Sequence, residues 1–588
     1  MSNLSNLREV MKKENVDYYI IPSADSHQSE YVPEYYKGRA YVSGFTGSAG
    51  TLLVGLDESY LWTDGRYFIQ AENQLRGSGI KLMKINTPGY PTLIEWIKDN
   101  IKDSKTLAFD GSTISTNEYK DYKQLSEKNN FNIKMDKDFL SLIWENRPEL
   151  SKEKIFIHDT KYCGKSASEK LKEVRVEMEK LEGENFIITS LDDIAWLFNI
   201  RGNDIAYNPV ALSYALINKD EAILYIEDEK VTEEDKKKLE NEGVSLKAYN
   251  KIYDDIKNIR GSVIIDVSKV NGKLYSLIPE DVKVIENLNI TTSLKAIKNE
   301  VEIKNMEVSQ VRDGVAMVKF IKWLKENINK INMDEVSVAD KLEEIRSKGE
   351  NFKGLSFDTI CGYKEHAAMM HYSATEESKY NLKAERMLLI DSGAQYLDGT
   401  TDITRTFILG QISEEEKRDF TLVLKSHIAL ATTIFLKGVS GVNLDAISRR
   451  PLWKYGMDYK CGTGHGVGFF LNVHEGPQAV RPFGTSVPLE PGMVVTNEPG
   501  AYKEGKHGIR IENTLLVTEA LKDKEMGEFY KFNTISYCPI DLEGVDISLL
   551  NEEEIEWLND YHTTVYEKLS PYLDEEEKEF LKRETRRI

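Results

Sequence analysis

Two stretches in the first half of the chain repeat one pattern of residues, and this repeat is the strongest restriction on the fold. The first copy comprises residues 16–31, VDYYIIPSADSHQSEY, followed by residues 41–64. The second copy comprises residues 184–202 followed by residues 211–231. Each copy reads as an apolar strand, a polar turn, a short helix-like segment and a hairpin. The repeat therefore predicts two related α/β domains in succession.

The chain has 588 residues, which is too long for one ordinary core and suggests three or four domains. We expect the boundaries to give domains 1–155, 156–297 and 298–588. The third begins with apolar residues that recur at helical spacing from Val308 to Leu324, so we expect them to form the core face of a long helix. We expect the last roughly 40 residues to form a charged helical extension beyond the functional motifs.

Four carboxylates and one histidine in the last third of the chain stand in strand-like or turn-like segments among small and apolar neighbours. In residues 387–409 an apolar run ends at Asp391, and an alternating run follows a glycine-containing loop. This pattern predicts a β-hairpin whose two arms bring Asp391 and Asp402 close together. Alternation places Thr404 on the same face as Asp402, and leaves Ile403 for the apolar side.

A second pair of acids lies further along the chain. Residues 492–502 read as a strand that ends at Glu498, where a proline and a glycine follow. Residues 507–517 read as the next strand, with Arg510 and Glu512 on one face, so we expect a second hairpin. His465 lies between the two pairs, in a run whose alternate glycines allow the backbone to approach a crowded centre.

If these five side chains meet, the site requires metal, because gathering four carboxylates without counter-charge costs several kcal/mol per ion. Two divalent cations would cancel that charge. Mn²⁺, Zn²⁺ or Co²⁺ suit one histidine among oxygen donors, and the oxygen-rich set favours Mn²⁺. Two ions roughly 3.5 to 4 Å apart could hold a bridging water, lower its pKa towards about 7 and polarise a scissile carbonyl. Glu498 is the candidate to accept that water's proton and pass it to the departing nitrogen.

Five stretches, MMHYSA, DSGAQYLDGTTDITRT, GTGHGVGFFLNVHEGP, NEPGAY and HGIRIEN, are similar in order and spacing to the metallopeptidases of the pita-bread fold. Among these the chain resembles the cytosolic three-domain Xaa-Pro aminopeptidases. The resemblance implies an α/β (α+β) fold, in which two creatinase-like N-terminal α/β domains precede a C-terminal pita-bread catalytic domain. It also implies these metal ligands: Asp391 on one ion, His465 and Glu498 on the other, and Asp402 and Glu512 on both.

The same resemblance implies that His371 and His474 contact the substrate around the scissile bond, and that the enzyme is a cytoplasmic homodimer. The implied reaction removes the residue before a penultimate proline. That bond is a tertiary amide with no N–H and with φ fixed by the ring, so we expect an apolar pocket for the ring. His371 and His474 would line its polar edge, and Arg510 could balance the acids and contact the substrate.

Two other functions remain open. A prolidase would have the same centre but would cleave Xaa-Pro dipeptides, and two N-terminal domains favour the aminopeptidase by family analogy. A non-catalytic pita-bread binding module is the third possibility, and the complete set of five ligands counts against it.

Composition excludes several other classes of protein. The net charge of −20 and pI near 5.2 argue against nucleic acid, which needs a basic face. The chain has no signal-type apolar run at its start and no stretch of ~20 apolar residues, so we expect neither export nor a membrane span. Four scattered cysteines predict free thiols. Cys461 lies near His465 but is more simply a packing residue than a ligand.

Overall fold

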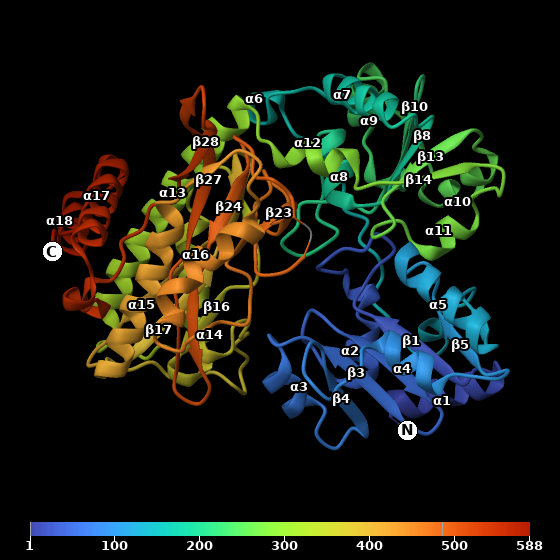
Figure 1. Cartoon of the computed structure of the whole chain (residues 1–588), viewed down its shortest axis with the longest axis horizontal. Helices are drawn as coiled ribbons and strands as arrows, with labels where there is room; N and C mark the ends of the chain where they lie inside the picture. Colours follow the sequence, from blue (N-terminus) through green and yellow to red (C-terminus); the bar gives the residue numbers. More distant parts are fainter. Residues whose placement is uncertain (1, 485) are drawn as a thin grey trace. The chain divides into compact units, whose positions relative to one another are not determined.

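The computed structural model describes residues 2–484 and 486–588, and the chain forms two compact units (Figure 1). Unit 1 comprises residues 1–158 and 165–293, and unit 2 comprises residues 159–164 and 294–588. The two predicted N-terminal domains therefore lie in one compact unit, and the boundaries at residues 155 and 297 stay predictions. All the site residues named above belong to unit 2.

The first half of unit 1 is a six-stranded mixed sheet in the order β4-β3-β2-β1-β5-β6. β1 pairs antiparallel with β2 and parallel with β5. Its strands are β1 (Tyr18–Pro22), β2 (Thr51–Gly55), β3 (Ser59–Thr63), β4 (Ile80–Lys84), β5 (Thr106–Phe109) and β6 (Asn132–Lys134). Its helices are α1 (Asn3–Lys13), α2 (Gly38–Ser43), α3 (Phe68–Gln74), α4 (Leu93–Asn100) and α5 (Thr116–Asn129).

The second half of unit 1 repeats this topology, in the order β12-β11-β10-β8-β13-β14. β8 pairs antiparallel with β10 and parallel with β13, as β1 does with β2 and β5. The predicted repeat is confirmed at the level of strand order and direction. Its strands are β8 (Asn185–Ile188), β10 (Tyr214–Asn218), β11 (Ala222–Tyr225), β12 (Ser245–Lys247), β13 (Ser262–Ile265) and β14 (Lys283–Glu286); β7 (Phe156–Ile157) and β9 (Ile200–Arg201) form a short ribbon. Its helices are α7 (Ala167–Lys180), α8 (Leu191–Leu197), α9 (Glu233–Asn241), α10 (Ile252–Asp255) and α11 (Gly272–Ser276).

Main-chain hydrogen bonds join the two halves of unit 1. The N–H of Thr116 donates to the carbonyl of Val270 at 2.9 Å, and the N–H of Gly272 donates to the carbonyl of Ile114 at 2.8 Å. The buried ring of His27 completes this junction, because its Nδ1 lies 2.9 Å from the carbonyl oxygen of Thr189 in the other half. His27 therefore has a structural role in this unit.

The described residues of unit 2 form four sheets, which are β15-β18-β19, β16-β17-β20, β21-β28-β27-β24-β22-β23 and the ribbon β25-β26. The strands are β15 (Phe352–Leu355), β16 (Ile360–Tyr363), β17 (Met387–Ser392), β18 (Ala394–Tyr396), β19 (Gly399–Thr400), β20 (Ile403–Ile408), β21 (Ile434–Leu436), β22 (Gly464–Gly466), β23 (Glu475–Val480), β24 (Val494–Asn497), β25 (Gly500–Lys503), β26 (His507–Arg510), β27 (Asn513–Asp523) and β28 (Gly527–Thr534). The helices are α6 (Thr160–Cys163), α12 (Ile290–Ala296), which begins in unit 1, α13 (Glu300–Asn327), α14 (Glu335–Arg346), α15 (Glu414–Ala431), α16 (Gly441–Trp453), α17 (Glu552–Leu569) and α18 (Glu575–Glu584).

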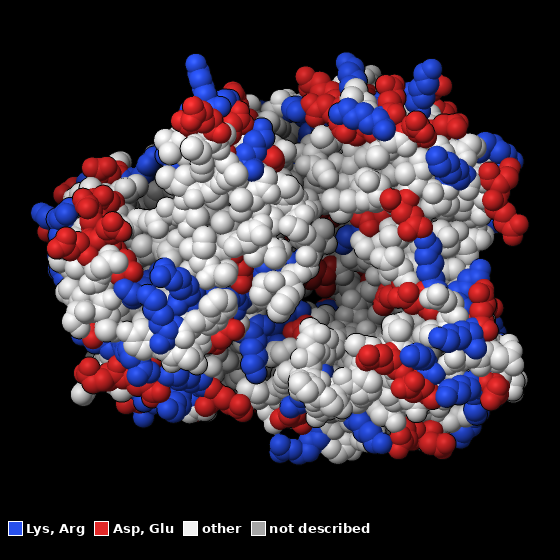
Figure 2. Space-filling view, in the orientation of Figure 1, with Lys and Arg blue, Asp and Glu red and all other residues white. Residues whose placement is uncertain are grey.

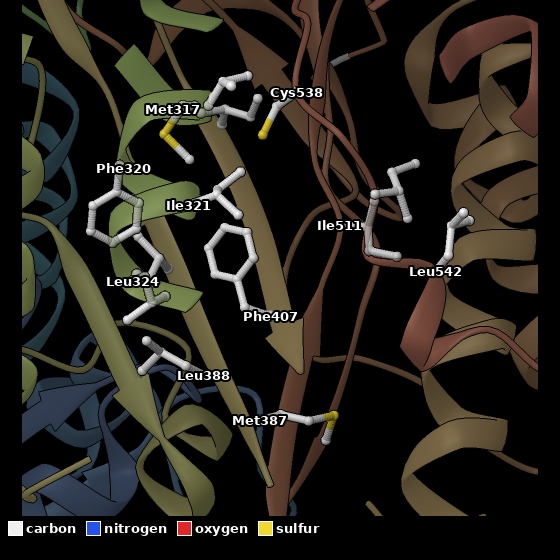
Figure 3. Close-up of a cluster of buried hydrophobic side chains, with 14 of the residues drawn as sticks. Met317, Phe320, Ile321, Leu324, Met387, Leu388, Phe407, Ile511, Cys538 and Leu542 are labelled. Carbon is white, nitrogen blue, oxygen red and sulfur yellow. The ribbon is translucent and has the colours of Figure 1, made fainter. Parts of the chain in front are cut away.

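The long helix α13 begins at a capping box, in which the Asn299 side chain accepts from the N–H of Glu302 and the Glu302 carboxylate accepts in return. Its C-terminal half packs into the main core of unit 2, and Figure 3 shows Ile321 beside Phe407 of β20. The prediction that Val308 belongs to the core face was wrong, because its side chain is 47% exposed. The buried face there passes through polar residues such as Ser309 and Asp313 instead, which a purely apolar pattern does not reveal.

The C-terminal helices α17 and α18 are part of the core, not an extension beyond it. Leu558 and Val565 of α17 and Phe580 of α18 are buried in the same cluster as α13 and β20. The Tyr561 hydroxyl accepts a hydrogen bond of 2.8 Å from Arg405, whose guanidinium also donates to the carbonyl of Glu512. Helix α17 therefore holds Arg405 of β20 in place, and Arg405 in turn contacts the backbone of the candidate ligand Glu512.

On the face of each unit visible in Figure 2, acidic and basic side chains are interspersed over the surface. This distribution differs from the one-sided basic surface that phosphate backbones require. Among the helices formed by residues 2–484 and 486–588, none has both the length and the apolar character needed to cross a bilayer. The four cysteines are free thiols in the structure, as predicted.

Candidate metal centre

The first predicted hairpin is present, and it presents Asp391 and Asp402 from neighbouring strands. β17 pairs antiparallel with β20, so that Asp391 lies opposite Thr404, and Asp402 directly precedes β20. The Thr404 hydroxyl points to the acids and donates to Glu512 Oε2 at 2.7 Å, whereas Ile403 and Phe407 are buried in the apolar core. The alternation predicted for this strand is confirmed.

The second hairpin differs from the prediction, because both of its arms bend at the glutamates. β24 pairs with β27 in the large sheet, whereas β25 and β26 form a separate ribbon. The bends occur because the N–H groups of the glutamates bond outside the hairpin. Glu498 donates to the carbonyl of Thr463 at 2.7 Å, and Glu512 donates to the carbonyl of Thr404 at 3.1 Å. Both carboxylates thereby turn towards the same point.

His465 enters the centre on β22, where its backbone packs tightly against neighbouring strands. A Cβ added to Gly464 would lie 1.9 Å from the carbonyl oxygen of Thr496, so only glycine fits there. The ring Nδ1 lies 2.9 Å from the carbonyl oxygen of Gly466, and since a carbonyl only accepts, Nδ1 carries the proton. Nε2 therefore faces Asp402 Oδ2 at 3.3 Å and Glu498 Oε1 at 3.6 Å.

Arg510 lies at the edge of the acids and is almost fully buried. Its guanidinium donates to Asp391 Oδ2 at 2.6 Å, to the Thr404 hydroxyl at 3.1 Å and to the Tyr502 hydroxyl at 2.6 Å. Each of these contacts is with the protein, so its expected contact with substrate stays a prediction. Tyr502 was not predicted from the sequence, although it lies on β25 two residues after Gly500, which pairs with Arg510, so the strand pairing could have indicated it.

The electrostatics of the centre show an excess of negative charge. Burial raises the pKa of Asp391, Glu498 and Glu512, and for each of them neighbouring acids raise it further. Burial alone would lower the pKa of His465, but the hydrogen bond to Asp402 and the charge of Glu498 raise it to about 9. In the metal-free chain, these groups therefore favour their protonated forms.

The donor set fits divalent cations. Asp402, His465 and Glu512 each offer a ligand atom, and the three atoms lie within 4.8 Å of one another. Asp391 Oδ1 is buried and has no hydrogen-bond partner among the described residues. Burying a carboxylate oxygen without a hydrogen-bond partner costs free energy unless a cation binds to it. Cys461 packs against the cluster formed by Leu422, Leu452 and Tyr459, in keeping with its predicted role in packing.

The two histidines expected outside the ligand set lie in segments next to the centre. The ring of His474 meets His465 edge to face, with centroids 4.3 Å apart. His371 is half-buried and follows Met370, whose carbonyl oxygen lies 3.5 Å from Arg510 Nη2. Two further histidines of unit 2 have structural contacts: His366 bonds to Glu335, and His507 bonds to Asp419 at 2.9 Å.

The sequence matches the model of metallopeptidase family M24 over residues 304–519 and that of the C-terminal region of this family over residues 528–588. Two models of creatinase/prolidase N-terminal domains match residues 3–136 and 146–302. This order of domains confirms the predicted architecture of two creatinase-like domains followed by a pita-bread domain.

The chain is 41% identical over 609 residues to a probable Xaa-Pro aminopeptidase P of Paracoccidioides brasiliensis, with 100% of this chain and 98% of that protein covered. It is 41% identical over 596 residues to a protein of the same description from Laccaria bicolor, with 99% and 92% covered.

Two solved structures show how far the likeness extends. The X-prolyl aminopeptidase from Caenorhabditis elegans, described as a cytosolic enzyme with a di-nuclear active site, matches with a TM-score of 0.96 at 34% identity, over 100% of this chain and 99% of that one. The Xaa-Pro dipeptidase from Bacillus anthracis matches with a TM-score of 0.51 at 24% identity, over 64% of this chain and 99% of that one, which supports a common fold. With relatives this similar over its whole length, the chain belongs to metallopeptidase family M24, among the Xaa-Pro aminopeptidase P proteins.

Proposed function

We propose that this chain is a metal-dependent Xaa-Pro aminopeptidase, which hydrolyses the first peptide bond of substrates whose second residue is proline. The observation that carries the proposal is the group of four carboxylates around His465, three of them buried, where negative charge exceeds what Arg510 can balance. The relatives matched over the full chain bear this activity in their names, and the Caenorhabditis elegans enzyme is described with a di-nuclear site.

Two divalent cations would bind to the five side chains as the family resemblance implies. Asp391 would bind one ion, His465 and Glu498 the other, and Asp402 and Glu512 both. The grouping of Asp402, His465 and Glu512 within 4.8 Å and the unpartnered Oδ1 of Asp391 support this assignment. Mn²⁺ is the favoured ion, because four of the five donors are carboxylates.

The chain's own groups have separate roles in the reaction. Bound cations would supply a water of lowered pKa and polarise the scissile carbonyl. Glu498, whose Oε1 lies 3.6 Å from His465 Nε2, would take a proton from that water and deliver it to the proline nitrogen. His371 and His474 would contact the peptide on either side of the scissile bond. Arg510 orients Asp391 through the hydrogen bond between them.

Proline on the leaving side makes proton delivery necessary. The scissile nitrogen is a tertiary amide, so it cannot donate a hydrogen bond that would help position the substrate. Orientation must therefore come from the carbonyl, the free N-terminus and the ring. The nitrogen also leaves poorly unless it is protonated, which is the reason to assign a proton carrier next to the water.

Turnover of a tripeptide with proline second, compared with an Xaa-Pro dipeptide, tests the reaction. We expect hydrolysis of the tripeptide, and turnover of the dipeptide alone would assign the chain to the prolidase reaction instead. Chelation should abolish activity, and adding Mn²⁺, Zn²⁺ and Co²⁺ in turn should restore it most with Mn²⁺. Activity that survives chelation, in protein free of divalent metal, would contradict the proposal.

A cytosolic homodimer is the assembly we propose for this enzyme. Unit 2 exposes large apolar side chains that a second copy could cover, including Trp453 at 50% and Phe483 at 82% exposure. β21 is also an edge strand of the large sheet and exposes Ile434 and Leu436. Light scattering of the purified protein should give twice the chain mass of 67.3 kDa, and a monomer mass at micromolar concentration would contradict this assembly.

A further inference from the structure

A buried carboxylate outside the metal centre gathers hydrogen bonds from a single neighbouring segment. Glu335 is the first residue of α14 and is fully buried. Its carboxylate accepts from the N–H of Tyr363 at 2.7 Å, the N–H of Tyr380 at 2.8 Å and the hydroxyl of Tyr372 at 3.0 Å. The Nδ1 of His366 lies 3.0 Å from both of its oxygens.

These four donors come from the two ends and the middle of one stretch, residues 363–380, which we call the histidine segment because it carries His371. Hydrogen bonds to an ionised acceptor are stronger than neutral ones, and the N-terminus of α14 favours the negative charge. The N–H of Glu335 itself donates to the carbonyl of Tyr380 at 3.2 Å. One residue therefore fixes both ends of the histidine segment.

Aromatic packing and an ion pair strengthen this attachment. The ring of His366 stacks on Tyr380, with centroids 3.8 Å apart and planes inclined by 24°. The ring of Tyr372, next to His371 in the chain, lies 4.5 Å from the same imidazole. Lys379 pairs at 3.0 Å with Asp334, the residue that caps α14.

The opposite side of the histidine segment packs on the strand that carries Arg510. A Cβ added to Gly508 of β26 would lie 1.7 Å from the carbonyl oxygen of Ala367, so the two backbones are in close contact. The carbonyl of Met370 faces Arg510 Nη2 at 3.5 Å. The segment is thus held between Glu335 on one side and β26, with its link to Asp391, on the other.

We propose that Glu335 is a positioning residue, which holds the histidine segment so that His371 is correctly oriented for the substrate. This inference rests on the proposed function. Without the carboxylate, the N–H groups of Tyr363 and Tyr380 lose their acceptor, and His371 can leave its productive position. A displacement of about 1 Å in a group that contacts the reacting bond is enough to cost about 100-fold in rate.

A double-mutant cycle on the metal-loaded enzyme tests the inference with a tripeptide that has proline second. Glu335→Gln keeps the size but places an amide donor among four donors, and we expect kcat to fall about 10- to 100-fold while KM and metal content change little. In the His371→Ala background the same substitution should have little further effect, because the residue acts through His371. Additive losses in the two backgrounds would overturn the inference.

Two further measurements separate this role from general stability and from the reaction. Glu416→Gln is the matched control, because Glu416 is a buried glutamate in the first turn of α15 that accepts from Ser413 and lies outside the histidine segment. It should leave kcat within about twofold. Hydrogen exchange of residues 363–380 should become faster in Glu335→Gln but not in Glu416→Gln. Unchanged exchange would overturn the inference whatever reaction the enzyme catalyses, whereas an inactive wild type with faster exchange in the variant would refute only the proposed function.

Discussion

Unit 2 buries carboxylates in two different settings. Asp313 receives two parallel hydrogen bonds from Arg346, at 2.9 and 2.9 Å, and a third at 3.0 Å from Tyr396. At the centre, by contrast, three buried carboxylates and the partly exposed Glu498 share Arg510 and His465. The two settings differ more in charge balance than in burial. The first kind of acid is satisfied by folding alone, whereas the second is satisfied only when cations bind, and this difference marks it as functional.

The largest effect should come from removing Glu512, which we propose as a ligand shared by two cations. Glu512→Gln keeps the hydrogen bond from Thr404 but removes the charge that two cations would share. We expect hydrolysis to fall by at least about 10³-fold, since the cations supply both the activated water and the polarised carbonyl. We also expect the metal-free variant to be more stable than metal-free wild type at pH 8, because burial disfavours the ionised form of Glu512.

Both outcomes can be measured on one preparation, by peptide hydrolysis and by urea unfolding in the presence of a chelator. A variant that loses stability along with activity would mean that Glu512 belongs with Asp313, among the acids that support the fold.

The converse test breaks a satisfied pair. Asp313→Ala removes the counter-ion of Arg346, whose side chain is fully buried. We expect a loss of about 3 to 5 kcal/mol in the free energy of unfolding, with metal content and kcat per folded molecule unchanged. Urea unfolding and active-site titration would report these two quantities. Lost metal binding in the folded variant would contradict the division between the two kinds of acid.

The sequence alone was sufficient to predict the features of the fold and the centre that depend on the local pattern of residues. Alternation in the first hairpin predicted the positions of Asp391 and Thr404, and the internal repeat predicted two sheets of the same order. The bend at Glu512 was not predictable, because periodicity does not reveal that a backbone N–H bonds to Thr404, 108 residues earlier in the chain. Pairs such as Asp313 with Arg346 could not be predicted for the same reason. The sequence pattern around an acid on a helix is the same whether the acid binds water or a distant arginine.

Stability as a function of pH should sharpen the comparison further. The folded pKa of His465, about 9, is above its unfolded value near 6.5, so its contribution is fully present below pH 6.5 and is lost as the pH rises through 9. The raised pKa values of Asp391, Glu498 and Glu512 act in the same direction, since their protonated forms favour the folded state.

Metal-free protein should therefore lose about 3 kcal/mol between pH 6.5 and 9 from His465 alone. Bound cations need deprotonated ligands, so metal-loaded protein should not show this loss. Thermal unfolding across that range, with and without chelator, would measure the difference. The slope should become shallower in His465→Asn, and a slope that is unchanged in that variant would assign the loss of stability to groups other than His465.

The smallest effect concerns the hydroxyl of Thr404, which contacts the proposed ligand Glu512. Thr404 donates to Glu512 Oε2 and accepts from Arg510 Nε, so Thr404→Val should loosen the orientation of both groups. We expect metal affinity to fall about 10- to 100-fold, the usual cost of losing a group that orients a ligand. Thr406→Val is the matched control, because Thr406 is the next residue on the same face and donates to the carbonyl of Arg510, with no contact to a ligand carboxylate. Competition with a chelating dye would measure both affinities. Equal losses in the two variants would mean that the strand as a whole, and not the hydroxyl of Thr404, maintains the geometry of the centre.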